Sequence, residues 1–108
     1  MQITHRQEGD FVVVSPEGRL DAPASHQLEE AINNLLADAS SSIVFHCVEV
    51  SYASSATLRV FLATAKRAKT RGVRCRFAEL TKPLQELFEM SGFIGVLDVH
   101  ETLESALS

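Results

Sequence analysis

The feature that most constrains the fold is the alternation of short apolar runs with amphipathic segments. The run Ile43-Val44-Phe45-His46-Cys47-Val48 is nearly continuous and rich in β-branched residues, which is typical of a central strand covered on both faces. The segment that follows, 55–71, predicts a helix whose last turns are basic and which Gly72 ends. Its apolar stripe consists of Leu58, Phe61, Leu62, Ala65 and Ala68. Strands and helices that alternate in this way predict an α/β domain with right-handed crossovers.

Turn and capping signals place the other elements. Asp21 can accept hydrogen bonds from free helix amides, and Pro23 suits a first helical turn. That helix should end near residues 37–39, before a serine loop at 40–42. Further predicted helices cover 81–90 and 102–107. Further predicted strands cover 2–7, 11–15, 73–78 and 94–99, with Pro16-Glu17-Gly18 ending the second strand. We therefore predict one domain over residues 1–108. It should contain a mixed sheet of four or five strands, with helices mainly packed on one face.

Charge and composition exclude several classes of function. The formal net charge of −4 disfavours a nucleic-acid binder or a protein that docks on anionic membranes. The apolar runs are strand-sized, too short to span a bilayer, and the first eight residues lack the apolar core of a signal peptide. Cys47 and Cys75 each lie in an apolar run, which predicts buried free thiols. We expect a cytoplasmic protein.

Catalytic and metal motifs are not apparent in the sequence. His5, His26, His46 and His100 are scattered, without the spacing of metal ligands. Glycine-rich phosphate loops and nucleophile elbows are missing as well. We therefore expect a protein that is not an enzyme and that needs neither a metal nor another cofactor.

The most unusual local sequence is a group of hydroxyl residues at 51–57, where a buried strand gives way to a helix. Serine and threonine are good N-caps, so the group could simply satisfy the first helix amides. A second explanation is an exposed serine whose phosphate would be held by those amides. The residues alone favour capping, and they leave phosphorylation open.

Three segments carry a resemblance to a known family. Gly18-Arg19-Leu20-Asp21 resembles a Gly-x-Leu-Asp motif before the first helix, and Val50–Leu62 matches an Asp-Ser-x-Gly-Leu signature without a gap. Leu87-Phe88-Glu89-Met90-Ser91-Gly92-Phe93 continues the match in both residue type and spacing. In these segments the chain resembles the STAS domain family, and specifically the bacterial anti-sigma factor antagonists that act in partner switches.

The resemblance implies roles for particular residues. Alignment through Leu58 places Ser55 at the family's phosphorylated serine, with Ser54 as the alternative acceptor. Ser54 then stands where the family usually has Asp, Thr57 where it has Gly, and His46 where an Asp is common in the preceding strand.

The resemblance also implies a binding face and partners. The predicted face comprises Asp21, Tyr52, Ser54, Ser55, Thr57, Arg59 and Lys66. The implied partner is an anti-sigma factor that is also a serine kinase of the histidine-kinase-like ATPase fold, bound before phosphorylation and released after it. A serine phosphatase would reset the protein.

Two alternatives remain open at this point. The missing Asp and Gly favour a STAS subunit that docks in a larger complex, such as a transporter, without being phosphorylated. A nucleotide-binding STAS module is the other, because some members of the family bind nucleotides, although the sequence lacks a phosphate-cradling motif.

Overall fold

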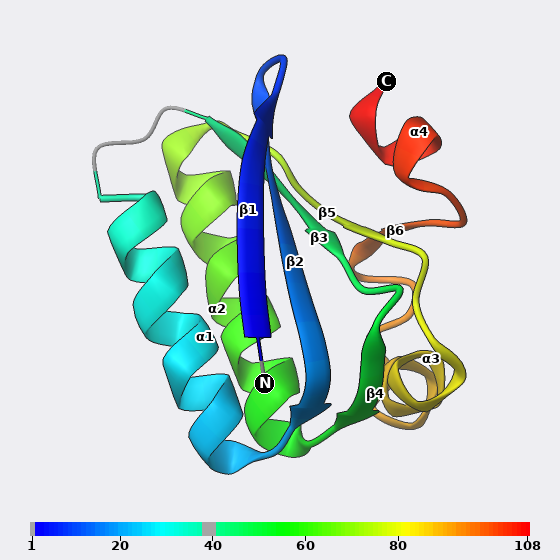
Figure 1. Cartoon of the computed structure of the whole chain (residues 1–108). Coiled ribbons are helices and arrows are strands. Elements are labelled where there is room, and N and C mark those ends of the chain that lie inside the picture. The colour runs from blue at the N-terminus through cyan, green and yellow to red at the C-terminus, as the bar shows by residue number, and fades with distance from the viewer. Residues whose placement is uncertain (1, 38–40) are drawn as a thin grey trace.

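A computed structural model describes residues 2–37 and 41–108. These residues form a six-stranded sheet in the order β1-β2-β3-β5-β6, with β4 paired to β2 (Figure 1). The strands are β1 (Gln2–Glu8), β2 (Phe11–Leu20), β3 (Ser42–His46), β4 (Val50–Ala53), β5 (Cys75–Ala78) and β6 (Asp98–His100). The helices are α1 (Ala22–Leu35), α2 (Ser55–Arg71), α3 (Lys82–Met90) and α4 (Leu103–Leu107).

The sheet is mixed, as predicted. Strand β1 runs antiparallel to β2, while β2–β3, β2–β4, β3–β5 and β5–β6 are parallel pairs. The α/β fold class is therefore confirmed. The sheet has six strands instead of four or five, because β4 forms a strand that the sequence did not indicate.

Strand β2 is longer than predicted, and the expectation that Pro16-Glu17-Gly18 ends it is wrong. Residues 11–14 pair with β3, and the strand pairs with β4 from Gly18 onward, after which a bulge shifts the register. Pro16 lies between these two paired stretches on that edge and faces Ile3 of β1 on the other. A proline is tolerated there because its missing N–H would have no ladder partner on the β3–β4 side.

The last strand is shorter and later than the predicted 94–99. Residues 94–97 form a turn in which the N–H groups of Val96 and Leu97 both donate to the carbonyl of Phe93, each at 3.0 Å. Only the Asp98–His100 stretch then pairs with β5. Of the apolar residues in this segment, Leu97 is buried and packs against the core, whereas Ile94 and Val96 are exposed.

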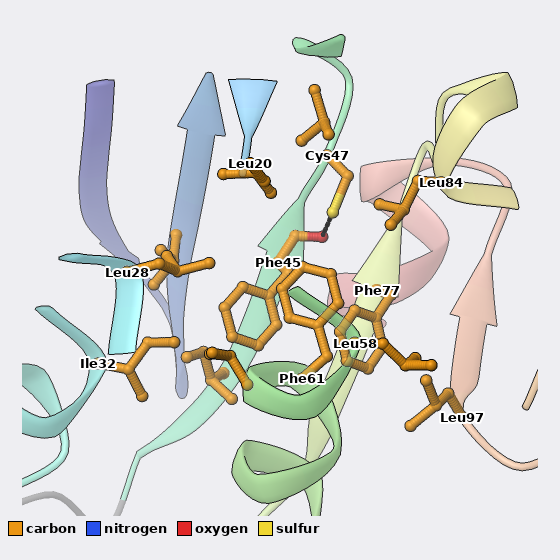
Figure 2. Packing of buried hydrophobic residues seen from close by; sticks show 14 of the residues in the cluster. Leu20, Leu28, Ile32, Phe45, Cys47, Leu58, Phe61, Phe77, Leu84 and Leu97 are labelled. Atoms are coloured by element: carbon orange, nitrogen blue, oxygen red, sulfur yellow. Dashed lines mark hydrogen bonds between the residues drawn. The ribbon is translucent and has the colours of Figure 1, made fainter. Parts of the chain in front are cut away.

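The core lies mainly between the sheet and the helices on one face. Helices α1 and α2 lie side by side over that face (Figure 1), and Phe45, Phe61 and Phe77 meet beneath α2 (Figure 2). Their ring centroids are 4.7–5.2 Å apart, and α3 adds Phe88 to the same cluster. On the other face, α4 covers a smaller cluster that includes Val44. The prediction of a central strand covered on both faces is confirmed in β3, but its predicted end at Val48 is wrong. The strand ends at His46, and Val48 lies in an exposed turn.

Most helix boundaries agree with the sequence. The prediction of a helix over 55–71 is confirmed in α2, and that over 81–90 in α3, for which Thr81 is the N-cap. Helix α1 ends at Leu35, and residues 38–40, where a helix end and the start of a serine loop were also expected, lie outside the described residues. Within the described ranges, none of the helices is long and apolar enough to cross a membrane.

Candidate partner-binding site

Helices α1 and α2 begin side by side, just after the C-terminal ends of β2 and β4. Leu20, at the end of β2, pairs with Ala53, at the end of β4, so the residues that follow them are neighbours. Asp21 is the N-cap of α1, and its Oδ1 accepts a hydrogen bond from the Ala24 N–H at 3.0 Å. The predicted capping role of Asp21 is confirmed, and its side chain remains exposed at this edge.

Three hydroxyl groups converge on one backbone carbonyl where the two helices begin. The hydroxyls of Thr57, Ser54 and Ser25 donate to the carbonyl oxygen of Leu20 at 2.8, 3.0 and 3.4 Å, respectively. The Ser25 and Thr57 hydroxyls also lie 3.0 Å apart, and the Thr57 oxygen accepts from the Ser54 N–H at 3.1 Å. This hydroxyl cluster (Ser25, Ser54 and Thr57) fixes the start of α2 to β2 and α1.

The cluster corrects one predicted partner contact. Thr57 is completely buried, so its side chain cannot touch a partner, and its role is to position the start of α2. Ser25 belongs to the same cluster but was missed by sequence reasoning. Its spacing to Leu28 and Ile32 places it on the buried stripe of α1, which is the signal that could have identified it.

Ser54 and Ser55 are adjacent but lie in different environments. Ser54 is half-buried, and its hydroxyl donates to Leu20. Ser55 is the first residue of α2, is exposed, and has no side-chain hydrogen bond to any described residue. The first helical hydrogen bond joins the Leu58 N–H to the Ser54 carbonyl at 3.2 Å. The backbone N–H groups of the helix before Leu58, including that of Ser55, therefore have no carbonyl acceptor within the helix.

Further along α2, Arg59 and Lys66 are both exposed and share its outward face with Ser55. Arg59 also borders a shallow groove of about 210 Å³ between α1 and α2. Neither side chain forms an ion pair or hydrogen bond within the described part of the chain. The outward face of α2 therefore presents a neutral hydroxyl at its start and cations farther along.

Tyr52 extends this exposed region onto the sheet. Tyr52 is 39% exposed on β4, and the guanidinium of Arg19 stacks 4.3 Å from the centroid of its ring. Arg19 and Tyr52 are register partners in β2 and β4. Arg19 was missed from the sequence because this pairing depends on β4. The stack holds an aromatic ring and a cation at the surface, the residue types that are enriched at binding hot spots.

Three of the four histidines lie close to carboxylates. His46 Nε2 lies 3.2 Å from Glu79 Oε2, and His100 Nε2 lies 2.9 Å from Asp98 Oδ1. His26 Nε2 lies 2.9 Å from Glu30 Oε1 on the surface of α1. Over the described residues, His, Cys, Asp and Glu side chains form no group of three or more that could hold a metal ion.

The cysteines are free thiols with low reactivity. Burial raises the pKa of the Cys47 thiol well above its usual range, and burial together with the nearby Asp98 carboxylate raises that of Cys75 to about 12. The prediction of free cysteines is confirmed, with Cys47 fully buried and Cys75 partly so. Neither has the low pKa of a nucleophilic cysteine.

Comparison with known proteins agrees with this geometry. The sequence pattern of the STAS domain family matches residues 2–106. This chain belongs to the STAS domain family. It is 26% identical to BtrV of Bordetella bronchiseptica, a protein named as a candidate anti-sigma factor antagonist, over 98% of this chain and 91% of that one.

Solved structures show the same fold. A candidate anti-sigma factor antagonist from Thermotoga maritima superposes with a TM-score of 0.91 at 14% identity, covering 97% of this chain and 91% of that chain. The anti-sigma factor antagonist SpoIIAA, of Bacillus, superposes in its unphosphorylated and phosphorylated forms with TM-scores of 0.84 and 0.77. Both comparisons are at 18% identity and cover 98% of this chain, and 93% and 96% of SpoIIAA.

Proposed function

We propose that this STAS protein is an anti-sigma factor antagonist that binds its partner when unphosphorylated and releases it when Ser55 is phosphorylated. The observation that carries the proposal is the contrast at the start of α2. Ser55 is exposed and its hydroxyl is unengaged within the described residues, whereas Ser54 and Thr57 are held by the Leu20 carbonyl.

A phosphate on Ser55 would lie where the helix favours negative charge. The first-turn amides carry a partial positive charge, so the phosphate would be tolerated without refolding. The same phosphate on Ser54 would require its hydroxyl to leave the Leu20 carbonyl. Ser55 is therefore the proposed acceptor, and Ser54 remains the alternative.

The release would act directly at the interface. A phosphate adds roughly −1.5 to −2 charges to a surface that the partner meets as a neutral hydroxyl. A lost hydrogen bond and the added desolvation would weaken binding by about 2–5 kcal/mol. That is a roughly 30- to 4,000-fold loss of affinity at about 1.4 kcal/mol per decade.

The proposed binding face contains Asp21, Tyr52, Ser55, Arg59 and Lys66, which are all exposed. Ser54, half-buried beside Ser55, would lie at its edge. The proposed partner is an anti-sigma factor with serine kinase activity and a histidine-kinase-like ATPase fold, which supplies the ATP itself. A serine phosphatase would reverse the modification.

The test is phosphosite mapping after incubation with the cognate kinase and ATP. We expect phosphate on Ser55, none on the Ser55→Ala variant, and unchanged modification of Ser54→Ala. The Ser55→Ala variant should bind the partner constitutively, and Ser55→Asp should bind it more weakly. Phosphate on Ser54 would show that Ser54, and not Ser55, is the acceptor.

A matched pair of charge reversals tests the binding face. Arg59→Glu should weaken partner binding and leave the thermal melt within about two degrees, because surface changes seldom alter stability. Lys82→Glu makes the same change at an exposed position on α3, and should leave binding unchanged. Equal losses of binding and stability in Arg59→Glu would assign that side chain to the fold instead.

A second candidate is a STAS subunit that docks without phosphorylation. The observation that favours it is the hydroxyl cluster itself, because Ser54 and Thr57 replace the Asp and Gly of the family signature. This candidate would be supported if the full chain bound its cognate partner and was not phosphorylated at any ATP concentration.

A further inference from the structure

A second concave surface lies along the C-terminal half of α2, on the side that faces β5 and the turn before β6. It is an open groove of about 440 Å³. Its apolar lining consists of Leu62, Ala65, Val73, Cys75, Val96 and Leu97. The groove is about twice the volume of the one between α1 and α2.

One wall of this groove is formed by the turn before β6, and the backbone of that turn places Val96 in solvent. Val96 is 71% exposed, although its neighbour Leu97 is 7% exposed and packs into the core. The two hydrogen bonds to the Phe93 carbonyl fix the turn that separates them. The outward position of Val96 is thus built into the fold.

The charge at this groove is opposite in sign to that of the whole chain. The chain has a net charge of −4, yet every charged residue of α2 is basic. Arg67 donates to the Asn33 side chain at 2.7 Å and Arg71 to the Leu36 carbonyl, so these two cations serve internal contacts.

Lys66 and Lys69 line the groove instead, and neither pairs with a side chain in the described ranges. The acidic residue in the lining is Asp98. Its carboxylate is paired with the Arg76 guanidinium at 3.3 Å and also lies 2.9 Å from His100 Nε2. The groove therefore combines an apolar floor with two unneutralised cations.

We propose that this groove docks an acidic amphipathic helix of a partner protein. From Leu62 to Lys69 the α2 wall extends about 10 Å, or about two helical turns. A docked helix would place apolar residues at i, i+3 or i+4, and i+7 on the floor, with acidic residues beside Lys66 and Lys69. This docking requires no phosphate on Ser55 and goes beyond the proposed switch.

Charge also disfavours two other occupants. A second copy related by a two-fold axis would bring the Lys66 and Lys69 side chains of both chains together, and such like charges repel. An anionic membrane would meet two lysines on a protein whose overall charge is negative. An acidic helix about two turns long contacts only the groove. Because charges are screened over about 8 Å, it is attracted by Lys66 and Lys69 more than it is repelled by acidic residues elsewhere on the chain.

The experiment titrates the ¹⁵N-labelled full chain with a synthetic helical peptide that carries leucines at i, i+3 and i+7 and glutamates on the flanks. We expect amide shifts at Leu62, Ala65 and Val96. The double variant Lys66→Glu/Lys69→Glu should bind about tenfold more weakly. Val96→Asp should also lose binding while its thermal melt stays unchanged, because the side chain is exposed.

Matched controls make the test decisive. Lys82→Glu, outside the groove, should bind the acidic peptide like the unmodified chain, and a peptide with lysines in place of the glutamates should bind at least about tenfold more weakly. Equal binding of both peptides, or shifts confined to other surfaces, would overturn the proposal. So would binding to vesicles containing phosphatidylserine without binding to the acidic peptide, or self-association of the free chain that Val96→Asp abolishes. The kinase is absent throughout, so the outcome is independent of the proposed switch at Ser55.

Discussion

At each end of α2, some polar side chains form hydrogen bonds within the fold and others face solvent; the residues are hydroxyls at the start and cations in the C-terminal half. At the start, Ser54 and Thr57 are held by the Leu20 carbonyl and Ser55 is left exposed. At the C-terminal half, Arg67 and Arg71 bind α1 and the residue that caps it, while Lys66 and Lys69 have no partner within the described residues.

This comparison separates structural from functional polar residues. Residues of the same type, one or two positions apart, are fixed by the fold or available to a partner according to where α1 and β2 lie. The engaged members should determine stability, and the free members should determine binding.

The largest effect is expected at the core that both ends of α2 share. Phe45 is completely buried, with its ring centroid 4.7 Å from that of Phe61 and 5.2 Å from that of Phe77. Phe45→Asp buries an unpaired carboxylate, which costs several kcal/mol, about the whole stability margin. Circular dichroism should show no cooperative melt. Val48→Asp, at an exposed position just after β3, should melt normally, and equal behaviour of the two would refute the assigned core.

The next effect contrasts two residues at the start of α2. Thr57→Val keeps the side-chain shape but leaves the Ser54 N–H without its acceptor, and should lower the free energy of unfolding by about 1–3 kcal/mol. Ser55→Ala should change it by less than about 0.5 kcal/mol. Urea denaturation measures both. Equal losses would mean that Ser55 also has a structural role.

A smaller effect is expected at the other end of the helix. Arg71→Ala removes the contact with the Leu36 carbonyl that ties α2 to the end of α1, and should cost about 0.5–1.5 kcal/mol. Lys69→Ala should be neutral in the same denaturation experiment, within about 0.5 kcal/mol. A greater loss in Lys69→Ala than in Arg71→Ala would reverse the assignment of these two cations.

The smallest effect concerns pH and contrasts the start of α2 with that of α4. The Leu103 N–H, at the start of α4, donates to Glu79 Oε2 at 2.9 Å and lowers the pKa of that carboxyl; partial burial opposes this, and His46 supports it. Because the folded pKa is depressed, the stabilisation is present above the ordinary carboxyl pKa of about 4.3 and is lost as pH falls below it.

Hydrogen exchange can measure this contrast. Below about pH 4 the Ala106 amide of α4 should lose protection before the Leu58 amide of α2, where neutral hydroxyls surround the helix start. Glu79→Gln should remove the difference in pH dependence. Parallel loss of protection at both amides, in the unmodified chain, would contradict the role of Glu79.

Local sequence signals predicted most of the helices. Asp21 followed by Pro23 marked the start of α1, and the basic last turn with Gly72 marked the end of α2. Gly72 takes a left-handed conformation, with φ at 72°, which glycine adopts without strain. These signals act within a few residues of where they stand in the chain, so they can be interpreted without knowing the tertiary fold.

Pairing between distant segments could not be predicted in the same way. Strand β4 exists because Val50–Ala53 meets the second half of β2, more than 30 residues earlier in the chain. The turn at 94–97 was predicted to be a strand because it is apolar, but its residue Leu97 contacts the core from a turn. Periodicity cannot distinguish these cases in short segments.

The sequence by itself determined the alternation of strands and helices, the central strand and the family resemblance. It also determined that several serine and threonine residues stand at the start of α2. Only the tertiary structure decided which hydroxyls are fixed. The Leu20 carbonyl that holds Ser54 and Thr57 is 34 and 37 residues away in sequence, and Ser25 reaches Thr57 from α1. Adjacent serines are chemically identical in the chain, and they differ only because the fold brings a hydrogen-bond acceptor to one of them and solvent to the other.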